Sequence, residues 1–381
     1  MSEKISQLCS RYGLKPSRRY GQNFLLDEAV LDKIIEAAEL SKSDTVVEIG
    51  PGFGALTFKL AEKAGRVLAF EIEKKIKPFW DDVLSHPARP ASPELQRGEG
   101  GAKGGRENVE IIWGDALVSL RATKGRSNPD GLRESFPWFN GIASPAFAGV
   151  NYPRNDTAYK VVANLPYQIT SPIIRAFLEA DNPPELMVLT VQKEVAERIC
   201  AQPGDMSILS VAVQYYAKPE IVAIVPRTAF WPVPEVDSAV VKIDNRQQKT
   251  DNRVKNEEFF KIVKAGFANR RKLLIKNLAQ LVSCCHPERS ETQPRDPLTQ
   301  SLRDSLPATP ASGLAWRAGS TRPDARSGLG RNDKSSGGKN NPEVLKQAFA
   351  KIGLKETVRA QELSVEQWQK LADCLGPGQF N

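Results

Sequence analysis

Histidine and cysteine are scarce in this chain: 381 residues contain two histidines and five cysteines. Both histidines, His86 and His286, lie in segments rich in proline, glycine and arginine that look like insertions. The folded body therefore offers no histidine as a general base or metal ligand, which argues against serine-histidine hydrolases and histidine-based zinc sites. The cysteines form no C-x-x-C pattern, and Cys284-Cys285-His286 has the wrong spacing for zinc. We expect reduced, non-catalytic thiols and no metal.

Long apolar runs are missing as well, since no stretch approaches the roughly 20 residues that span a bilayer. The segment Met1–Ser6 lacks the apolar core of a signal peptide, so we expect a cytoplasmic protein without a membrane partner. A hydrophobic content of 40% and a charged content of 26% are typical of a soluble globular chain, and 381 residues can form two domains. The net charge of +8 favours an anionic partner.

The most informative stretch is Lys160–Tyr167, an apolar run that ends in Asn164-Leu165-Pro166-Tyr167. It predicts a buried strand with the tetrapeptide at its carboxyl end, where open α/β sheets bind ligands. Pro166 has no N–H and favours an extended conformation at Leu165, while Tyr167 adds a flat aromatic face. The segment offers acceptors for an amino group beside a surface for a planar base. A strand that ends in an ordinary proline turn is the alternative.

A nucleotide-binding pattern precedes this stretch. The β-branched run 45–49 predicts a strand, Gly50-Pro51-Gly52-Phe53-Gly54 a turn, and residues 55–64 a helix. The next predicted strand, 66–70, ends in Glu71, an acid about 20 positions after the glycines that suits ribose hydroxyls. Pro51 is unusual in a pyrophosphate cradle, so the turn suits a ligand without phosphates, such as S-adenosylmethionine, better than NAD.

A third predicted strand, 108–113, leads to Asp115, which is a candidate acceptor for an adenine amine or, alternatively, a helix N-cap. Further patterns predict a helix after Asp27, strands at 184–191, 221–225 and 239–243, and helices at 192–200 and 206–214. The prolines of 230–238 predict a stiff loop without regular structure that presents Phe230 and Trp231; the alternative is a rigid connection whose aromatic side chains lie in the core.

From about residue 250 the pattern becomes helical and predicts a small helical domain. Arg270, Arg271 and Lys272 begin a predicted basic helix that suits a phosphate backbone, although a solvated charged face is the alternative. Three stretches rich in proline, glycine, serine and arginine, residues 85–106, 121–158 and 284–339, predict largely disordered insertions.

Six motifs in order make the sequence resemble the small-subunit rRNA adenine N6-dimethyltransferases of the KsgA type. They are Tyr20–Leu25, Glu48–Gly52 with Glu71, Gly114–Leu117, Asn164–Tyr167, Phe230–Ala239 and Phe267–Lys272. The resemblance implies an α/β fold: a Rossmann-like, seven-stranded class I methyltransferase domain over residues 1–250 and a helical RNA-contacting domain over 251–381. It also implies S-adenosylmethionine as methyl donor and two adjacent adenosines near the 3′ end of small-subunit rRNA, free or in an assembling subunit, as substrate. We expect a monomer.

Carried over by position, the resemblance implies a set of site residues. The cofactor would be bound by Gln22, Asn23, Leu25, Gly50, Gly52, Glu71, Ile72, Asp115, Ala116 and Asn164. Asn164 and Leu165 would accept hydrogen bonds from the target amine and free its lone pair for attack on the sulfonium methyl. Tyr167 and Phe230 would stack on the base.

Three other functions remain open at this point. Macrolide-resistance methyltransferases share the fold and an Asn-Leu-Pro-Tyr-type motif but act on large-subunit rRNA. The segment Val236–Ala239 looks more like the small-subunit enzymes. A non-catalytic ribosome-assembly factor would need a damaged site, and every motif position is intact. A dinucleotide oxidoreductase has no use for Asn-Leu-Pro-Tyr.

Overall fold

The computed structural model describes residues 2–16, 22–85, 107–117, 158–180, 182–246, 253–283 and 342–375. Ser85 ends a helix and Ala158 precedes a strand; the rest of the three predicted insertions lies outside the described residues. The basic pair Arg18-Arg19 and the motif residues Tyr20 and Gly21 lie outside them too.

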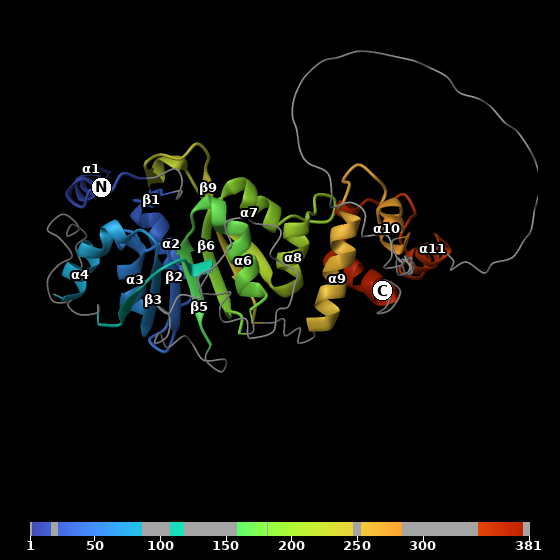
Figure 1. The fold of residues 1–381 in the computed structure, drawn as a ribbon, viewed down its shortest axis with the longest axis horizontal. Coiled ribbons are helices and arrows are strands. Elements are labelled where there is room, and N and C mark those ends of the chain that lie inside the picture. The colour runs from blue at the N-terminus through green and yellow to red at the C-terminus, as the bar shows by residue number, and fades with distance from the viewer. Residues whose placement is uncertain are drawn as a thin grey trace, which may run out of the picture.

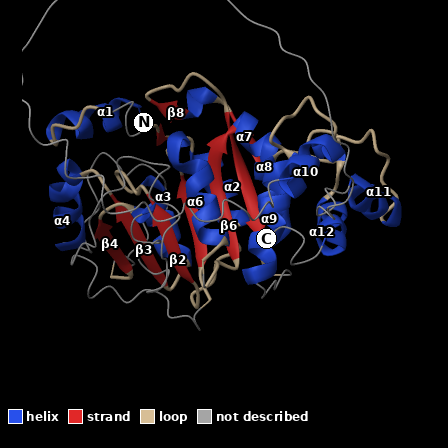
Figure 2. Cartoon of the chain, turned by 45° about the vertical axis from the view of Figure 1, so that its right-hand side comes forward, coloured by secondary structure: helices blue, strands red, loops and turns tan. Residues whose placement is uncertain are grey.

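Seven strands form one sheet in the order β4-β3-β2-β5-β6-β9-β7 (Figure 1 and Figure 2). The first five are parallel, and β9 runs antiparallel to both of its neighbours. Because the chain turns outward in opposite directions from β2 and β5, their carboxyl ends form the switch point where such sheets bind ligands. The strands are β2 (Thr45–Ile49), β3 (Arg66–Glu71), β4 (Val109–Trp113), β5 (Lys160–Asn164), β6 (Leu186–Gln192), β7 (Lys218–Val225) and β9 (Ser238–Asp244).

Alternating side chains of the strands enter two apolar layers. In β2, Val46 packs into one layer and Val47 into the other, and both are buried. One layer is completed by α1 (Ser2–Arg11), α2 (Glu28–Ala37), α3 (Ala55–Lys63) and α4 (Lys77–Ser85). The other is completed by α6 (Thr170–Leu178), α7 (Lys193–Ile199) and α8 (Ile208–Tyr216). The parallel strands are thus covered on both faces, which explains their continuous apolar sequences.

A third apolar cluster is built by the C-terminal helices together with α8. Its helices are α9 (Arg253–Gly266), α10 (Leu274–Ser283), α11 (Pro342–Lys351) and α12 (Val365–Leu375). Figure 1 places α9, α10 and α11 beyond α8, at the end of the molecule away from α1. The rings of Tyr215 in α8 and Phe259 in α9 stack with their centroids 4.2 Å apart. Helix α8 therefore belongs to both clusters, and the division at residue 250 remains a proposal.

The prediction that residues 230–238 lack regular structure is wrong at both ends, since Ser238 is already the first residue of β9. Phe230 and Trp231 form β8, which pairs antiparallel with β1 (Phe24–Leu25). The hydrogen bond from Leu26 N to Ala229 O, 2.8 Å long, continues this pairing. Pro232 follows the pair, so the proline limits the strand to two residues and does not prevent it. The helix predicted after Asp27 is confirmed as α2, and Asp27 caps it, because Asp27 Oδ1 accepts from Val30 N at 3.2 Å.

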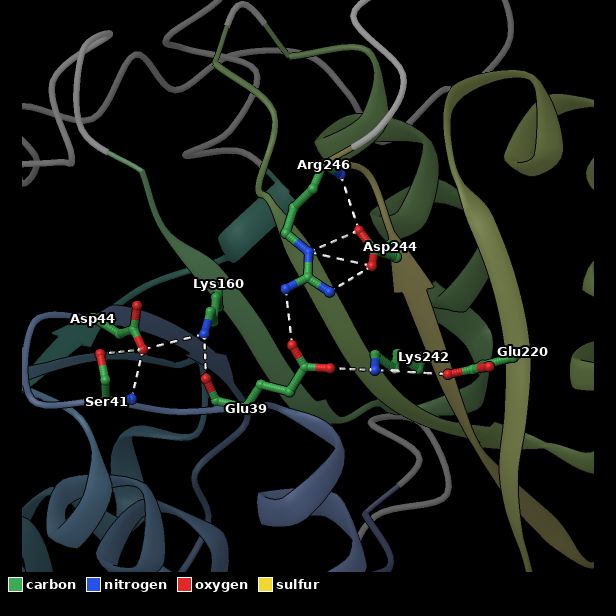
Figure 3. A network of polar contacts seen from close by, with 8 residues as sticks. All are labelled: Glu39, Ser41, Asp44, Lys160, Glu220, Lys242, Asp244 and Arg246. Atoms are coloured by element: carbon green, nitrogen blue, oxygen red, sulfur yellow. Dashed lines mark hydrogen bonds and ion pairs between the residues drawn. The ribbon is translucent and has the colours of Figure 1, made fainter.

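A polar network closes the amino-terminal edge of β5 (Figure 3). Lys160 donates to Glu39 O at 2.5 Å and to Asp44 Oδ2 at 3.1 Å. The Glu39 carboxylate accepts from Lys242 at 2.6 Å and from Arg246 at 2.8 Å, which lowers its pKa. The network joins the loop after α2 to β5 and β9, at the edge of the sheet opposite Asn164.

Candidate active site

One cavity lies at the carboxyl ends of β2, β3, β4 and β5, at the switch point of the sheet. Its lining includes all ten residues for which the sequence predicts cofactor contacts: Gln22, Asn23, Leu25, Gly50, Gly52, Glu71, Ile72, Asp115, Ala116 and Asn164. Leu165 and Tyr167 line it too. The structure therefore gathers segments that are far apart in the sequence, from Ile5 to Ile169, around one space.

The glycine turn after β2 depends on left-handed backbone at Gly50 (φ 73°), Gly52 (φ 54°) and Gly54 (φ 84°). A Cβ at Gly52 would lie 3.0 Å from Phe24, so a side chain there would also crowd β1. Gly52 O accepts from the Trp80 indole at 2.9 Å, which ties the turn to α4. These contacts fix the conformation of the turn where it lines the cavity.

Two glutamates, Glu48 of β2 and Glu71 of β3, line the cavity beside this turn. Glu71 Oε2 accepts from Gly52 N at 3.1 Å and Oε1 accepts from Glu73 N at 2.8 Å, so the acid of β3 holds the turn of β2 in place. Glu48 is 1% exposed, and its Oε2 has no hydrogen-bond partner in the part of the chain that the structure describes. Burial, and secondarily the charge of Glu71, raise the pKa of Glu48 to about 8. Burial also raises the pKa of Glu71.

Asp115 has the second of the two roles that the sequence leaves open, that of a cap, while its contact with an adenine amine remains a prediction. Its Oδ1 accepts from Leu117 N at 2.8 Å, so the carboxylate caps the turn that follows β4. The residue also lines the cavity. The cap bond fixes the carboxylate beside the cavity.

Asn164 ends β5, and its Nδ2 donates to Asn23 O at 3.0 Å. This bond ties Asn164, the first residue of the tetrapeptide, to the N-terminal segment that carries β1. Asn164 Oδ1 then points away from this bond and remains an acceptor. Leu165 N donates to Thr190 O at 3.2 Å, which holds the tetrapeptide against β6, and Tyr167 is half-buried at the cavity.

Comparison with known proteins identifies the family. The family model described as ribosomal RNA adenine dimethylase matches residues 13–90 and 138–293. The ribosomal RNA small subunit methyltransferase A of Dehalococcoides mccartyi is 39% identical over 279 residues, which are 73% of this chain and 79% of that protein. The enzyme of the same name from Pelotomaculum thermopropionicum is 41% identical over 279 residues, 72% of this chain and 81% of that protein. The chain belongs to the ribosomal RNA adenine dimethylase family.

Two solved structures confirm the predicted class I methyltransferase fold. A dimethyladenosine transferase from Plasmodium falciparum has a TM-score of 0.56 and 21% identity, covering 91% of this chain and 95% of that chain. The 23S rRNA methyltransferase ErmE has a TM-score of 0.53 and 21% identity, covering 93% and 99%. At this identity the likeness concerns the fold alone, so it does not separate the two rRNA targets.

Phe230 does not take the position that the sequence predicts. The expected loop was to present its ring, but β8 turns the side chain into the core, where it is 2% exposed. Phe230 is not among the residues that line the cavity. The pairing of Phe230 with Leu25 explains this burial, because the strand pair forms one wall of the apolar layer. Its stacking on a base remains a prediction.

The prediction that Arg270, Arg271 and Lys272 begin a basic helix is wrong, because all three lie in a turn. Helix α9 ends at Gly266 and α10 begins at Leu274, so Arg270, Arg271 and Lys272 are exposed between them. Buried Asn277 closes the turn, because its Nδ2 donates to Gly266 O at 2.6 Å and Asn269 O at 3.0 Å.

Sequence reasoning missed several residues at the cavity. Ile5 and Leu14 line it from α1 and the segment after it, although no motif marks them. Trp80 holds the glycine turn from α4, and Ser238 contacts Tyr167. Of these, only Ser238 carried a sequence signal, since it lies in the motif Phe230–Ala239. Among the described residues no group of three or more His, Cys, Asp or Glu could hold a metal ion, and no helix is long and apolar enough to cross a membrane.

Proposed function

We propose that this protein transfers methyl groups from S-adenosylmethionine to N6 of two adjacent adenosines near the 3′ end of small-subunit rRNA. The observation that carries the proposal is the shared cavity of the glycine turn, the strand-end acids and Asn164-Leu165-Pro166-Tyr167. Family membership and the relatives named ribosomal RNA small subunit methyltransferase A support the RNA substrate and its subunit.

The lining of the cavity fits a cationic cofactor. Its acidic residues are Glu48, Glu71 and Asp115, of which Glu48, with a pKa of about 8, is mostly protonated at neutral pH, and among the described residues no lysine, arginine or histidine lines it. S-adenosylmethionine carries a sulfonium and an ammonium group, which negative charge attracts in a partly desolvated site. A dinucleotide would place its pyrophosphate among these acids, so the oxidoreductase alternative is disfavoured.

Each lining segment has a role toward this cofactor. Gly50 and Gly52 would contact its methionine part, and Glu71 would accept from its ribose hydroxyls. Asp115 and Ala116 would bind its adenine. Gln22, Asn23, Leu25, Ile72 and Asn164 complete the set of proposed contacts. When bound, the cofactor supplies a methyl group on an already activated sulfur.

The chain's own chemistry acts on the target amine, whose lone pair is delocalised into the adenine ring. Hydrogen bonds from the amine to Asn164 Oδ1 and Leu165 O favour a pyramidal nitrogen and localise its lone pair. The bond between Asn164 Nδ2 and Asn23 O sets the side chain in the orientation that leaves Oδ1 for the substrate. Tyr167 provides a stacking face worth about 1–3 kcal/mol per base. The protein thus contributes position and electrostatics.

The helical region contributes RNA binding in this proposal. Residues 251–381 form an RNA-contacting domain beside the methyltransferase domain of residues 1–250. The exposed turn of Arg270, Arg271 and Lys272 presents three positive charges on a backbone fixed by Asn277. Such a turn suits RNA phosphates, whose neutralisation releases counterions.

The experiment is to incubate the protein with methyl-labelled S-adenosylmethionine and immature small subunits, with naked small-subunit rRNA and with large-subunit RNA. The expected product is N6-dimethyladenosine at two adjacent positions near the 3′ end of the small-subunit RNA. Label in large-subunit RNA would favour the macrolide-resistance type of activity. Absence of label in all three RNAs would favour a non-catalytic assembly factor.

A further inference from the structure

A hydrogen bond connects the tetrapeptide after β5 to the first residue of β9. The hydroxyl groups of Tyr167 and Ser238 lie 2.8 Å apart, and either can donate. Tyr167 lines the cavity, whereas Ser238 belongs to the segment between Phe230 and Ala239. The bond therefore joins two of the six motifs on which the family resemblance rests.

Ser238 is held more rigidly than its partner. Its side chain is fully buried, and its backbone pairs with Gln192 of β6 on one side and Val225 of β7 on the other. The preceding residue, Asp237, is bonded twice: its carbonyl accepts from Lys193 N at 3.0 Å, and its Oδ1 accepts from Arg227 N at 2.9 Å. The Ser238 hydroxyl is thus a fixed point of the sheet.

Tyr167 is only half-buried and follows a proline in a short turn of 3-10 helix. Without a partner, a ring in this position would sample several rotamers, and ordering it on binding would cost conformational entropy. A bond to the phenolic oxygen fixes the end of the side chain farthest from the backbone. Burial, together with the charge of Asp237, raises the pKa of Tyr167, so the phenol stays protonated in this contact.

We propose that Ser238 is a positioning residue for the target base, because it fixes the Tyr167 ring at the angle at which adenine stacks. The proposal rests on the proposed function for the identity of the base. Ser238 touches neither cofactor nor substrate and acts through Tyr167 alone. The bond thereby lets the loop after β8 set the shape of the base site from outside the cavity.

A purely structural role for the bond makes a different prediction, namely lower stability with unchanged stacking. The chain supplies matched controls for this alternative. The hydroxyl of Tyr159 donates to Asn182 O at 2.9 Å, and that of buried Ser210 donates to Ser207 O at 2.9 Å. Tyr159→Phe and Ser210→Ala delete the same chemical groups away from the cavity.

The test is a double-mutant cycle with Ser238→Ala, Tyr167→Phe and both together in the full chain. We expect each single variant to lower kcat/KM for RNA by about threefold to tenfold, the range of one net hydrogen bond. The double variant should lose no more than either single one, and cofactor affinity should stay unchanged. Multiplied losses, or an unchanged kcat/KM in Ser238→Ala, would overturn the proposal.

Two further readouts separate positioning from stability. With 2-aminopurine in place of the target adenosine, stacking on Tyr167 quenches the fluorescence of the base. Ser238→Ala and Tyr167→Phe should quench it less than the wild type does. Tyr159→Phe and Ser210→Ala should quench it as strongly as the wild type does. With 3-fluorotyrosine in the protein alone, the Tyr167 resonance, assigned by its loss in Tyr167→Phe, should shift toward that of an exposed tyrosine in Ser238→Ala. An unchanged resonance would refute the proposal whatever RNA the wild type methylates. Methylation mapping of the wild type tests the proposed function separately.

Discussion

Asn164 Nδ2 donates a 3.0 Å hydrogen bond to Asn23 O across 141 residues of sequence. This bond couples the segment before α2 to the end of β5 and decides which atom of the Asn164 amide is left for a substrate. The same side chain therefore has a structural half and a chemical half. A substitution that deletes the amide removes both, so cofactor affinity and methyl transfer have to be measured separately.

Asn164→Ala is expected to abolish methyl transfer, because the amine loses an acceptor, while cofactor affinity stays within about tenfold, the equivalent of 1.4 kcal/mol. Transfer is measured with labelled S-adenosylmethionine and affinity by calorimetry. Asn245→Ala is the control, since it also removes an amide bonded to a carbonyl, Pro184 O at 3.2 Å, at a distant loop. Near-normal turnover in Asn164→Ala would refute the proposed mechanism.

Gly52→Ala is expected to weaken cofactor binding by about tenfold or more, since a methyl group both strains the backbone and crowds Phe24. Gly353→Ala is the matched control, because Gly353 also has a positive φ of 73° but no atom within 4 Å of the place that a methyl group would occupy. Both variants should melt earlier, and Gly52→Ala more so because of the contact with Phe24. Equal cofactor affinity in the two variants would contradict the role of the turn.

Glu48 should make stability depend on pH in the neutral range. Its pKa is raised from 4.5 to about 8 in the fold, so its favourable contribution is complete below pH 4.5 and is lost as the pH rises through 8. Glu48→Gln should therefore gain stability relative to wild type at pH 9 and much less at pH 5. Melting temperatures at both pH values measure this, with exposed Glu62→Gln as control. A constant difference between pH 5 and pH 9 would argue against a buried, protonated Glu48.

Replacing Arg270 and Arg271 by alanine is expected to weaken RNA binding and to reduce the salt slope of log K by about one for each phosphate that is no longer neutralised. Filter binding at several salt concentrations measures both. The control is Lys351→Ala with Lys355→Ala, which removes the same charge from exposed positions of the helical region. If both double variants lose affinity equally, net charge and not the turn explains binding.

Lys160→Met is expected to destabilise the fold by about 3 kcal/mol, because it leaves partly buried Asp44 without its cation. Lys242→Met should cost about 1 kcal/mol or less, since its partners Glu39 and Glu220 are 41% and 57% exposed. Urea unfolding of both variants gives the two values. Equal losses would show that burial of the pair does not determine its contribution.

The sequence predicted the cavity well because its signals are local. Gly52, Glu71 and Asp115 each follow an apolar run, and parallel strands bring their carboxyl ends to one edge of a sheet. This rule places residues from four strands without any knowledge of side-chain contacts. The seven strands fall close to the predicted ranges because each is an apolar run, whereas α4 and α6, which lie between strands, were not predicted.

Contacts between distant segments were not predictable in this way. The burial of Phe230 follows from its pairing with Leu25, about 200 residues away in sequence, and no local pattern encodes that pairing. The error at Arg270–Lys272 has a similar cause. Helical periodicity continues through these residues, but the Asn277 side chain bonds the carbonyls of Gly266 and Asn269 and stabilises a turn.

The double membership of α8 has a consequence for dissecting this chain. Val213 packs under the sheet, whereas Val211 and Tyr215 pack against the C-terminal helices. A fragment that ends at residue 250 would expose the apolar side chains of α8 that the C-terminal helices cover, and would be prone to self-association. The two halves are better studied by surface substitutions in the intact polypeptide than by truncation.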